Sequence, residues 1–124
     1  MRVLVYENSK DRAKLLQDLL GRYRYKVEVK YDSPTTLEGI QELKPTLIIL
    51  NVNNKNHVEL LEKISRNTRL SKIPMILIST DASREVIAKM HNFTNVDYLV
   101  EPFKIKNFRH MVERWVTLRS LYVN

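Results

Sequence analysis

Asn51 occupies the position in this sequence where chemistry would most be expected. It follows an unbroken apolar run, residues 47–50, which is preceded by Pro45 and followed by the polar residues Asn53 and Asn54. Such a bounded run is typical of a strand buried on both faces in the middle of a parallel sheet. Open α/β sheets bind their ligands at the carboxyl ends of such strands. An amide is neither an effective nucleophile nor a useful base, so we expect no reactive group at Asn51.

Other predicted strands also end in polar residues. The run 2–6 is followed by Glu7 and Asn8, the run 73–78 by Ser79, and the run 95–100 by Glu101. A further segment, 25–31, alternates apolar and charged residues, which predicts a half-exposed strand at the edge of the sheet, with its tyrosines and valines pointing inward.

Helical spacing of apolar residues appears between the strands. The first helix spans 10–23 and is capped by Ser9 or Asn8. The second opens at Asp32-Ser33-Pro34 and stops at Pro45, and the others run from 58, from 83 to about 92, and from about 104 to 121. The face of the first helix that we expect to be buried consists of Ala13, Leu15, Leu16, Leu19, Leu20 and Tyr23.

Five strands that alternate with five helices predict an α/β fold. Crossover helices make the strands parallel and cover both faces of the sheet. We therefore predict one domain over 1–124, a doubly wound, flavodoxin-like five-stranded parallel sheet of order 2-1-3-4-5.

The composition restricts the function further. The 124 residues carry 21 Lys+Arg and 14 Asp+Glu, a net charge of +7, and no cysteine. A basic chain favours acidic partners, although solvated surface cations explain the same count. With no run long enough for a membrane span and no signal peptide, we expect a soluble, cytoplasmic protein or an excised domain of one.

The ordered motifs resemble the receiver domain of two-component response regulators, of the chemotaxis-regulator type. The resemblance covers essentially the whole chain. It rests on an acidic end to the first strand, on Pro-x-Leu-Ile-Ile-Leu at 45–50, on Arg-Leu-Ser-Lys-Ile-Pro at 69–74, and on Asp-Tyr-Leu-Val-x-Pro-Phe at 97–103.

The resemblance also identifies a pocket, and several of its residues depart from the family pattern. It places the two magnesium-binding acids at Glu7 and Asn8, the phosphoacceptor aspartate at Asn51, the hydroxyl residue at Ser79, and the invariant lysine at Glu101. Phosphoryl transfer to a carboxylate needs that nucleophile together with cationic charge. We therefore expect a degenerate pseudo-receiver that is not phosphorylated, is not an enzyme, and has neither metal nor cofactor. Two other possibilities stay open: that the two carboxylates hold a cation, and that Lys55 or Lys104 pairs with one of the glutamates.

A protein-binding function is the main prediction. The resemblance matches an aromatic switch residue to Tyr98, which alternatively is simply packed at the sheet edge. We expect a partner surface on the fourth helix, fifth strand and last helix, in two-component-type signal transduction. Its predicted residues are Arg84, Ile87, Met90, His91, Tyr98, Lys106, Arg109 and Glu113.

Alternative functions remain at this stage. The last helix carries five Lys/Arg and one acid, which would suit the regulatory domain of a DNA-associated transcription regulator. A receiver phosphorylated at another residue is a third possibility. The end of that helix, with Trp115, Leu118, Leu121 and Tyr122 in register, could form a homodimer or begin a linker. His57, His91 and His110 show no metal spacing and are expected at the surface.

Overall fold

Five parallel strands form one sheet in the order β2-β1-β3-β4-β5, as the sequence predicts. The computed structural model describes residues 1–23, 25–34 and 36–123 and, in the last helix, side chains as far as Trp115. The register is continuous, with Val5 beside both Val29 and Ile49. Within the described residues the strands are β1 (Arg2–Tyr6), β2 (Lys26–Lys30), β3 (Leu47–Asn51), β4 (Met75–Ser79) and β5 (Val96–Val100).

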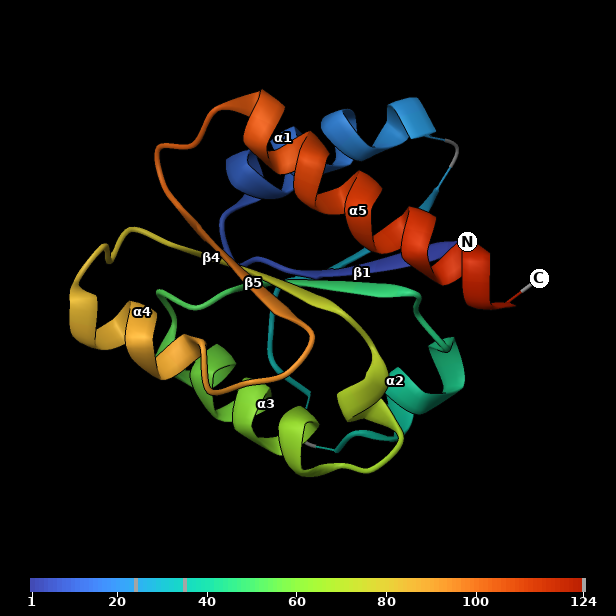
Figure 1. Ribbon diagram of the computed structural model, residues 1–124, viewed down its shortest axis with the longest axis horizontal. Coiled ribbons are helices and arrows are strands. Elements are labelled where there is room, and N and C mark those ends of the chain that lie inside the picture. Colours follow the sequence, from blue (N-terminus) through green and yellow to red (C-terminus); the bar gives the residue numbers. More distant parts are fainter. Residues whose placement is uncertain (24, 35, 124) are drawn as a thin grey trace.

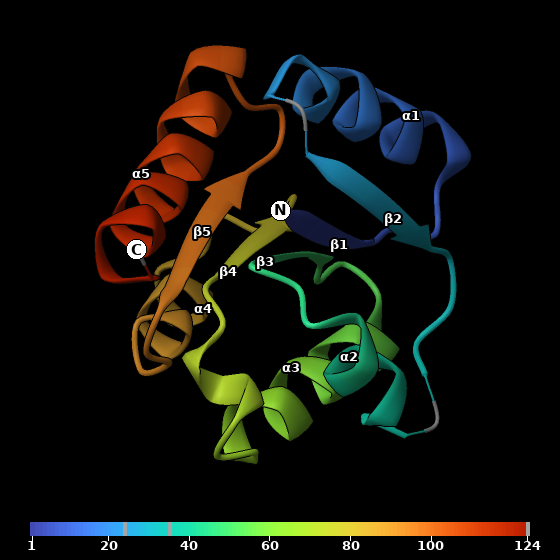
Figure 2. The same ribbon diagram turned by 90° about the vertical axis from the view of Figure 1, so that its right-hand side faces the viewer.

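Helices cover both faces of this sheet (Figures 1 and 2). One face carries α1 and α5, and the other carries α2, α3 and α4, as right-handed crossovers between parallel strands require. The described helices are α1 (Lys10–Leu20), η1 (Gly21–Tyr23), α2 (Glu38–Leu43), α3 (Lys55–Arg66), η2 (Leu70–Lys72), α4 (Arg84–Met90) and α5 (Ile105–Val123), of which η1 and η2 are short 3₁₀ turns.

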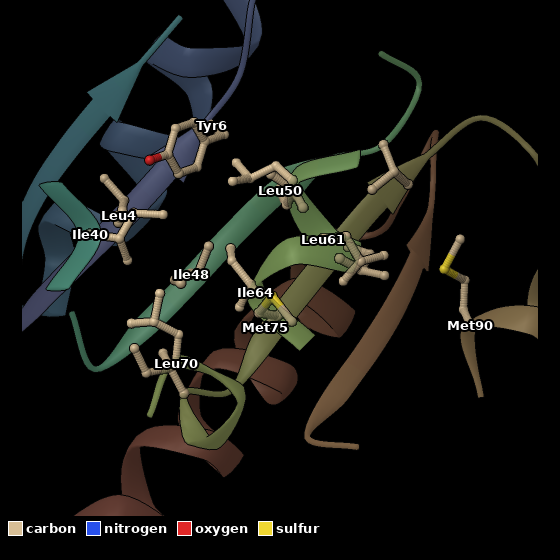
Figure 3. Packing of buried hydrophobic residues seen from close by; sticks show 14 residues of the cluster. Leu4, Tyr6, Ile40, Ile48, Leu50, Leu61, Ile64, Leu70, Met75 and Met90 are labelled. Carbon is tan, nitrogen blue, oxygen red and sulfur yellow. The ribbon is translucent and has the colours of Figure 1, made fainter. Parts of the chain in front are cut away.

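The core is divided by the sheet into two layers. Every residue of β3 and of β4 is buried, which confirms both as central strands. Because successive strand residues point to opposite faces, Ile48 and Leu50 pack toward α3, and Leu47 and Ile49 pack toward α1 and α5. Figure 3 shows the first layer, in which Leu61 and Ile64 of α3 lie over the sheet.

The start of the second helix and the burial of two side chains differ from the prediction. The helix expected from Asp32 begins at Glu38, after Leu37, which provides no side-chain cap. Ser33 precedes a proline and is therefore disfavoured in helical conformation, so this segment extends the loop. Leu15 is 46% exposed, because it lies outside the stripe of α1 that is formed by Leu16, Leu19 and Leu20. Tyr31 is 45% exposed, because β2 ends one residue earlier at Lys30.

Other local predictions are confirmed. The Ser9 hydroxyl caps α1 by accepting the Arg12 amide N–H at 3.4 Å, and Ser83 caps α4 in the same way. In the described part of the chain no helix is long and apolar enough to cross a membrane. The side chains of Leu118, Leu121 and Tyr122, on which a dimer or linker was predicted, lie outside the described residues.

Candidate functional site

The carboxyl ends of β1, β3, β4 and β5 meet at one edge of the sheet, as parallel strands require. The fold therefore brings together the residues that the sequence grouped into a pocket. Glu7, Asn51 and Ser79 are each at most 4% exposed, Glu101 is half-buried, and Asn8 is exposed at the surface. Asn8 is consequently the one member of the predicted pocket that faces solvent.

Glu7 and Asn51 are bonded directly to each other. The Asn51 Nδ2 atom donates to Glu7 Oε2 at 2.5 Å, and the Ser9 backbone N–H donates to Glu7 Oε1 at 3.1 Å. Both carboxylate oxygens therefore already accept a hydrogen bond, and no ion pair to Glu7 occurs within the described residues. This buried carboxylate is compensated by N–H donors and not by a cation.

Asn53 closes the pocket, and sequence reasoning missed it. Its backbone N–H donates to Asn51 Oδ1 at 2.9 Å. Its own Oδ1 accepts three hydrogen bonds, from Ser79 Oγ at 3.0 Å, from the Thr80 backbone N–H at 2.9 Å and from Thr80 Oγ1 at 3.1 Å. The sequence signal was weak, because Asn53 is one of several amides in a polar loop.

A second set of bonds leads from Ser79 toward Tyr98. Ser79 Oγ accepts the Asp81 backbone N–H at 3.0 Å, and the Asp81 carbonyl accepts the Tyr98 hydroxyl at 2.5 Å. The Asp81 carboxylate accepts the Ser83 N–H at 2.8 Å. This backbone bond, with a further contribution from the Ser83 side chain, lowers the pKa of Asp81. Tyr98 is half-buried against the core, which is compatible with both of its predicted roles.

Glu101 pairs with an arginine and not with a lysine. Arg12 Nε lies 3.1 Å from Glu101 Oε2, and the glutamate side chain is 16% exposed. The possible pairing of a lysine with one of the pocket glutamates is not seen among the described residues, because the turn after β5 directs Glu101 toward the first turns of α1. The Glu101–Pro102 peptide bond in this turn is cis.

His57 lies beneath Asn51 and is fully buried, so its prediction as a surface residue is wrong. Its Nδ1 lies 2.7 Å from the Asn51 carbonyl oxygen, and its ring meets Tyr6 edge-on at 6.0 Å. Nδ1 must carry the proton in this bond, since a carbonyl oxygen is an acceptor only. The helical period of α3 gives the reason for the burial, because His57 shares a face with Leu60, Leu61 and Ile64. His91 and His110 are exposed, as predicted.

The predicted partner residues do not all lie on one surface. Met90 is 5% exposed and belongs to the core, which excludes it as a contact residue. Glu113 accepts a hydrogen bond from the Tyr23 hydroxyl at 3.0 Å, so it faces η1 and not α4. Burial, followed by that bond, raises the pKa of Tyr23. Arg84, His91 and Lys106 are exposed, whereas Ile87, Tyr98 and Arg109 are half-buried.

The pocket offers little of the chemistry that its position allows. In the described residues no three His, Cys, Asp or Glu side chains are grouped as a metal site. The donor set does not suit Mg²⁺, which prefers carboxylates, because the oxygens of Glu7 are occupied by N–H donors and Glu101 is held by Arg12. The Ser79 hydroxyl donates to an amide oxygen, which is too weak a base to activate it as a nucleophile.

Comparison with known proteins places this arrangement in a family. Residues 3–113 match the response regulator receiver domain. Chemotaxis protein CheY1 of Helicobacter pylori is 25% identical over 118 residues, which cover 91% of this chain and 94% of CheY1. The two-component response regulator ARR10 of Arabidopsis thaliana is 27% identical over an alignment of 128 positions, which covers 100% of this chain and 23% of ARR10.

Solved structures agree with the fold. Chemotaxis protein CheY4 of Vibrio cholerae superimposes with a TM-score of 0.78 at 21% identity, covering 91% of this chain and 96% of that one. The signal receiver domain of a DNA binding response regulator from Colwellia psychrerythraea gives 0.82 at 14% identity, covering 94% and 98%. The match to the family extends over nearly the whole sheet and its helices, and the chain belongs to the response regulator receiver domain family of two-component signalling.

Proposed function

We propose that this receiver domain, with asparagine at residue 51, takes up no phosphoryl group and acts in signalling by binding a protein partner. The observation that carries the proposal is the Asn51 side chain, which is bonded on one side to Glu7 and on the other to the Asn53 backbone. A carboxamide is a poor nucleophile. Here its nitrogen and its oxygen are also both hydrogen-bonded within the protein.

The charges around Asn51 support the same proposal. Transfer of a phosphoryl group requires positive charge where its oxygens develop negative charge. Glu101 instead contributes a carboxylate at this edge of the sheet, and the nearby Arg12 is already paired with it. Glu7, the remaining buried acid, has both oxygens bonded to N–H groups. Phosphoryl transfer needs a nucleophile, a cation site and compensating positive charge, and this pocket differs in all three.

Intact mass spectrometry after incubation with acetyl phosphate and magnesium tests this part of the proposal. We expect the mass of the protein to be unchanged, whereas a receiver with aspartate at the end of β3, treated in parallel, gains a phosphoryl group. A covalent phosphate at high occupancy on this chain, at any residue, would end the proposal and favour phosphorylation at another position.

The partner surface that we propose lies on α4, β5 and the first turns of α5. It combines a half-buried aromatic residue, Tyr98, and an aliphatic one, Ile87, with the exposed cations Arg84 and Lys106. Aromatic residues and arginine are enriched at protein interfaces. Met90 and Glu113 are left out because the first is in the core and the second bonds to Tyr23.

A pull-down with a matched control tests the surface. We expect the Arg84→Glu/Tyr98→Ala double variant to lose partners that the wild type retains. The control is Lys63→Glu/Tyr31→Ala, which makes the same kinds of change at residues exposed elsewhere on the chain. The proposed surface is contradicted if both variants lose the same partners, or if neither variant loses any.

The DNA-associated alternative is less favoured by the structure. Part of the positive charge of α5 is compensated within the domain, because Arg114 is ion-paired with Asp97 of β5. Binding through phosphates weakens steeply as salt rises, whereas an apolar protein interface does not. Titration against duplex DNA at two ionic strengths separates the two candidates, and tight binding with a steep salt dependence would favour the alternative.

A further inference from the structure

We propose that the side chain of Asn53 holds the end of β4 by accepting its hydrogen bonds, and that it thereby sets the position of Tyr98 although no phosphoryl group is bound in the pocket. This inference rests on the proposed function, in which no phosphoryl group reaches the pocket. It assigns to Asn53 the role of a positioning residue, one that acts through Ser79, Thr80 and Asp81.

The first step is the convergence of three donors on one atom. Asn53 Oδ1 lies 2.9 to 3.1 Å from the Thr80 backbone nitrogen and from the hydroxyl oxygens of Ser79 and Thr80. These groups belong to the last residue of β4 and the residue after it. A carbonyl oxygen can accept several hydrogen bonds but donates none, so all three donors are oriented toward it.

The second step is the anchoring of Asn53 itself. Its side chain belongs to an exposed residue and contributes little to the apolar core. Its backbone N–H is fixed to Asn51 Oδ1, and Asn51 is fixed to the buried carboxylate of Glu7. The oxygen that collects the three donors is therefore held in place from the pocket side, by a residue of a central strand.

The third step is the series of hydrogen bonds that connects the end of β4 to Tyr98. The Ser79 hydroxyl donates to Asn53, which leaves its lone pairs to accept the Asp81 N–H. The carbonyl of Asp81 then accepts the Tyr98 hydroxyl. Consecutive hydrogen bonds thus connect Glu7, Asn51, Asn53, Ser79, Asp81 and Tyr98.

The loop from Ser79 to Ser83 is short, and hydrogen bonds fix its end to the start of α4. The Asp81 carboxylate accepts the Ser83 N–H, and the Ser83 hydroxyl caps α4 by accepting the Val86 N–H. A movement of the Ser79–Asp81 segment would therefore change the position of the Tyr98 hydroxyl and the start of α4 together. Both belong to the proposed partner surface. By linkage, a partner that displaces Tyr98 acts back on the contacts of Asn53 by the same free energy.

Amide hydrogen exchange and ring signals measured by NMR test the inference. In Asn53→Ala the Thr80 amide loses its acceptor and should exchange roughly three- to tenfold faster, the range expected for one neutral hydrogen bond. The informative signals lie further along the path. The Asp81 amide should also exchange faster, and the ring resonances of Tyr98 should shift.

Two other variants show whether the order of the links is right. Ser79→Ala should leave the Thr80 amide protected by Asn53, while it releases the Asp81 amide and shifts Tyr98. Asn53→Asp keeps an acceptor oxygen and should retain protection of the Thr80 amide. The matched control is Asn56→Ala, the same change at another exposed asparagine two residues into the α3 segment.

The outcomes are separable from those of the phosphorylation test. If Asn53→Ala and Asn56→Ala give the same Asp81 exchange and the same Tyr98 resonances, the inference is wrong. If Asn53→Ala does not fold, as judged by circular dichroism, Ser79→Ala carries the test, and an unchanged Tyr98 in that variant overturns it. A covalent phosphate on the wild type would instead overturn the proposed function and leave these measurements unaffected.

Discussion

The amide of Asn51 donates to the buried carboxylate of Glu7 across a distance of 2.5 Å, and this bond determines what a substitution at residue 51 does. An aspartate there would replace the donor with a second carboxylate beside the first. Like charges at such a distance cannot both remain ionised at little cost. The effect of a substitution at residue 51 on the free energy of unfolding therefore depends on the charge of Glu7.

We expect Asn51→Asp to lower the free energy of unfolding by about 2–4 kcal/mol in the absence of divalent cations, because a buried charge loses its compensation. Mg²⁺ should raise the melting temperature of this variant and leave that of the wild type unchanged. Thermal unfolding with and without MgCl₂ measures both effects. In Glu7→Gln/Asn51→Asp the penalty should largely disappear, and its persistence there would place the cause elsewhere.

The ion pair between Arg12 and Glu101 is predicted to contribute little to stability. The arginine side chain is 44% exposed, so solvent screens the pair, and we expect a coupling free energy below about 1 kcal/mol. A double-mutant cycle of Arg12→Ala and Glu101→Gln, followed by urea unfolding, measures this coupling. It should decrease further as ionic strength rises. A coupling well above that bound would show that the pair is structural.

Replacement of His57 should have a large effect on stability, although it lies at no expected functional position. His57→Ala leaves a cavity and an unsatisfied buried carbonyl on Asn51, so we expect a loss of about 2–4 kcal/mol. His57→Leu fills most of the space and loses only the hydrogen bond, which should cost about 1–3 kcal/mol. The exposed His91→Ala is the control, with an expected change within about 0.5 kcal/mol. Equal losses at residues 57 and 91 would contradict the burial described here.

Alkaline pH should destabilise the protein through Tyr6. Burial raises the pKa of its phenol from 10.0 to about 12, so the unfolded chain releases this proton at a lower pH than the folded one. Between these pH values the folded state binds more protons, and stability falls as pH rises, by about 2–3 kcal/mol from this group. Urea unfolding from pH 9 to pH 12 measures the slope.

Tyr6→Phe isolates that contribution from the titration of lysines and other tyrosines. The variant should lose less stability than the wild type over the same pH range. Tyr31→Phe changes an exposed phenol and should follow the wild type. Parallel slopes for the wild type and Tyr6→Phe would refute a raised pKa at Tyr6.

Most of the fold was predictable from the sequence because its signals are local. The unbroken apolar run before Asn51 identified a central strand, and Ser9 identified the start of α1, since each depends on neighbouring residues alone. The connections between strands then allowed few topologies. The start of α2 was misplaced because Ser33 and Pro34 resemble a helix opening but continue the loop.

The contacts within the site were less predictable, because they depend on which long-range neighbours a side chain meets. A lysine was a possible partner for a pocket glutamate, and the fold instead places Arg12 of α1 beside Glu101. His57 was expected at the surface, although its spacing from Leu61 and Ile64 on α3 places it in the core. Asn53 carried only a weak local signal, since it is the packing of β4 beside β3 that brings its oxygen to Ser79.

The oxygen of Asn53 has a further consequence if the proposed function is correct. An acyl phosphate is hydrolysed and remade, so a domain that depends on one can be reset within its lifetime. A carboxamide that is part of the polypeptide persists until the molecule is degraded. The strength of the output would then follow the number of copies in the cell, and synthesis and proteolysis would be the steps at which it is adjusted.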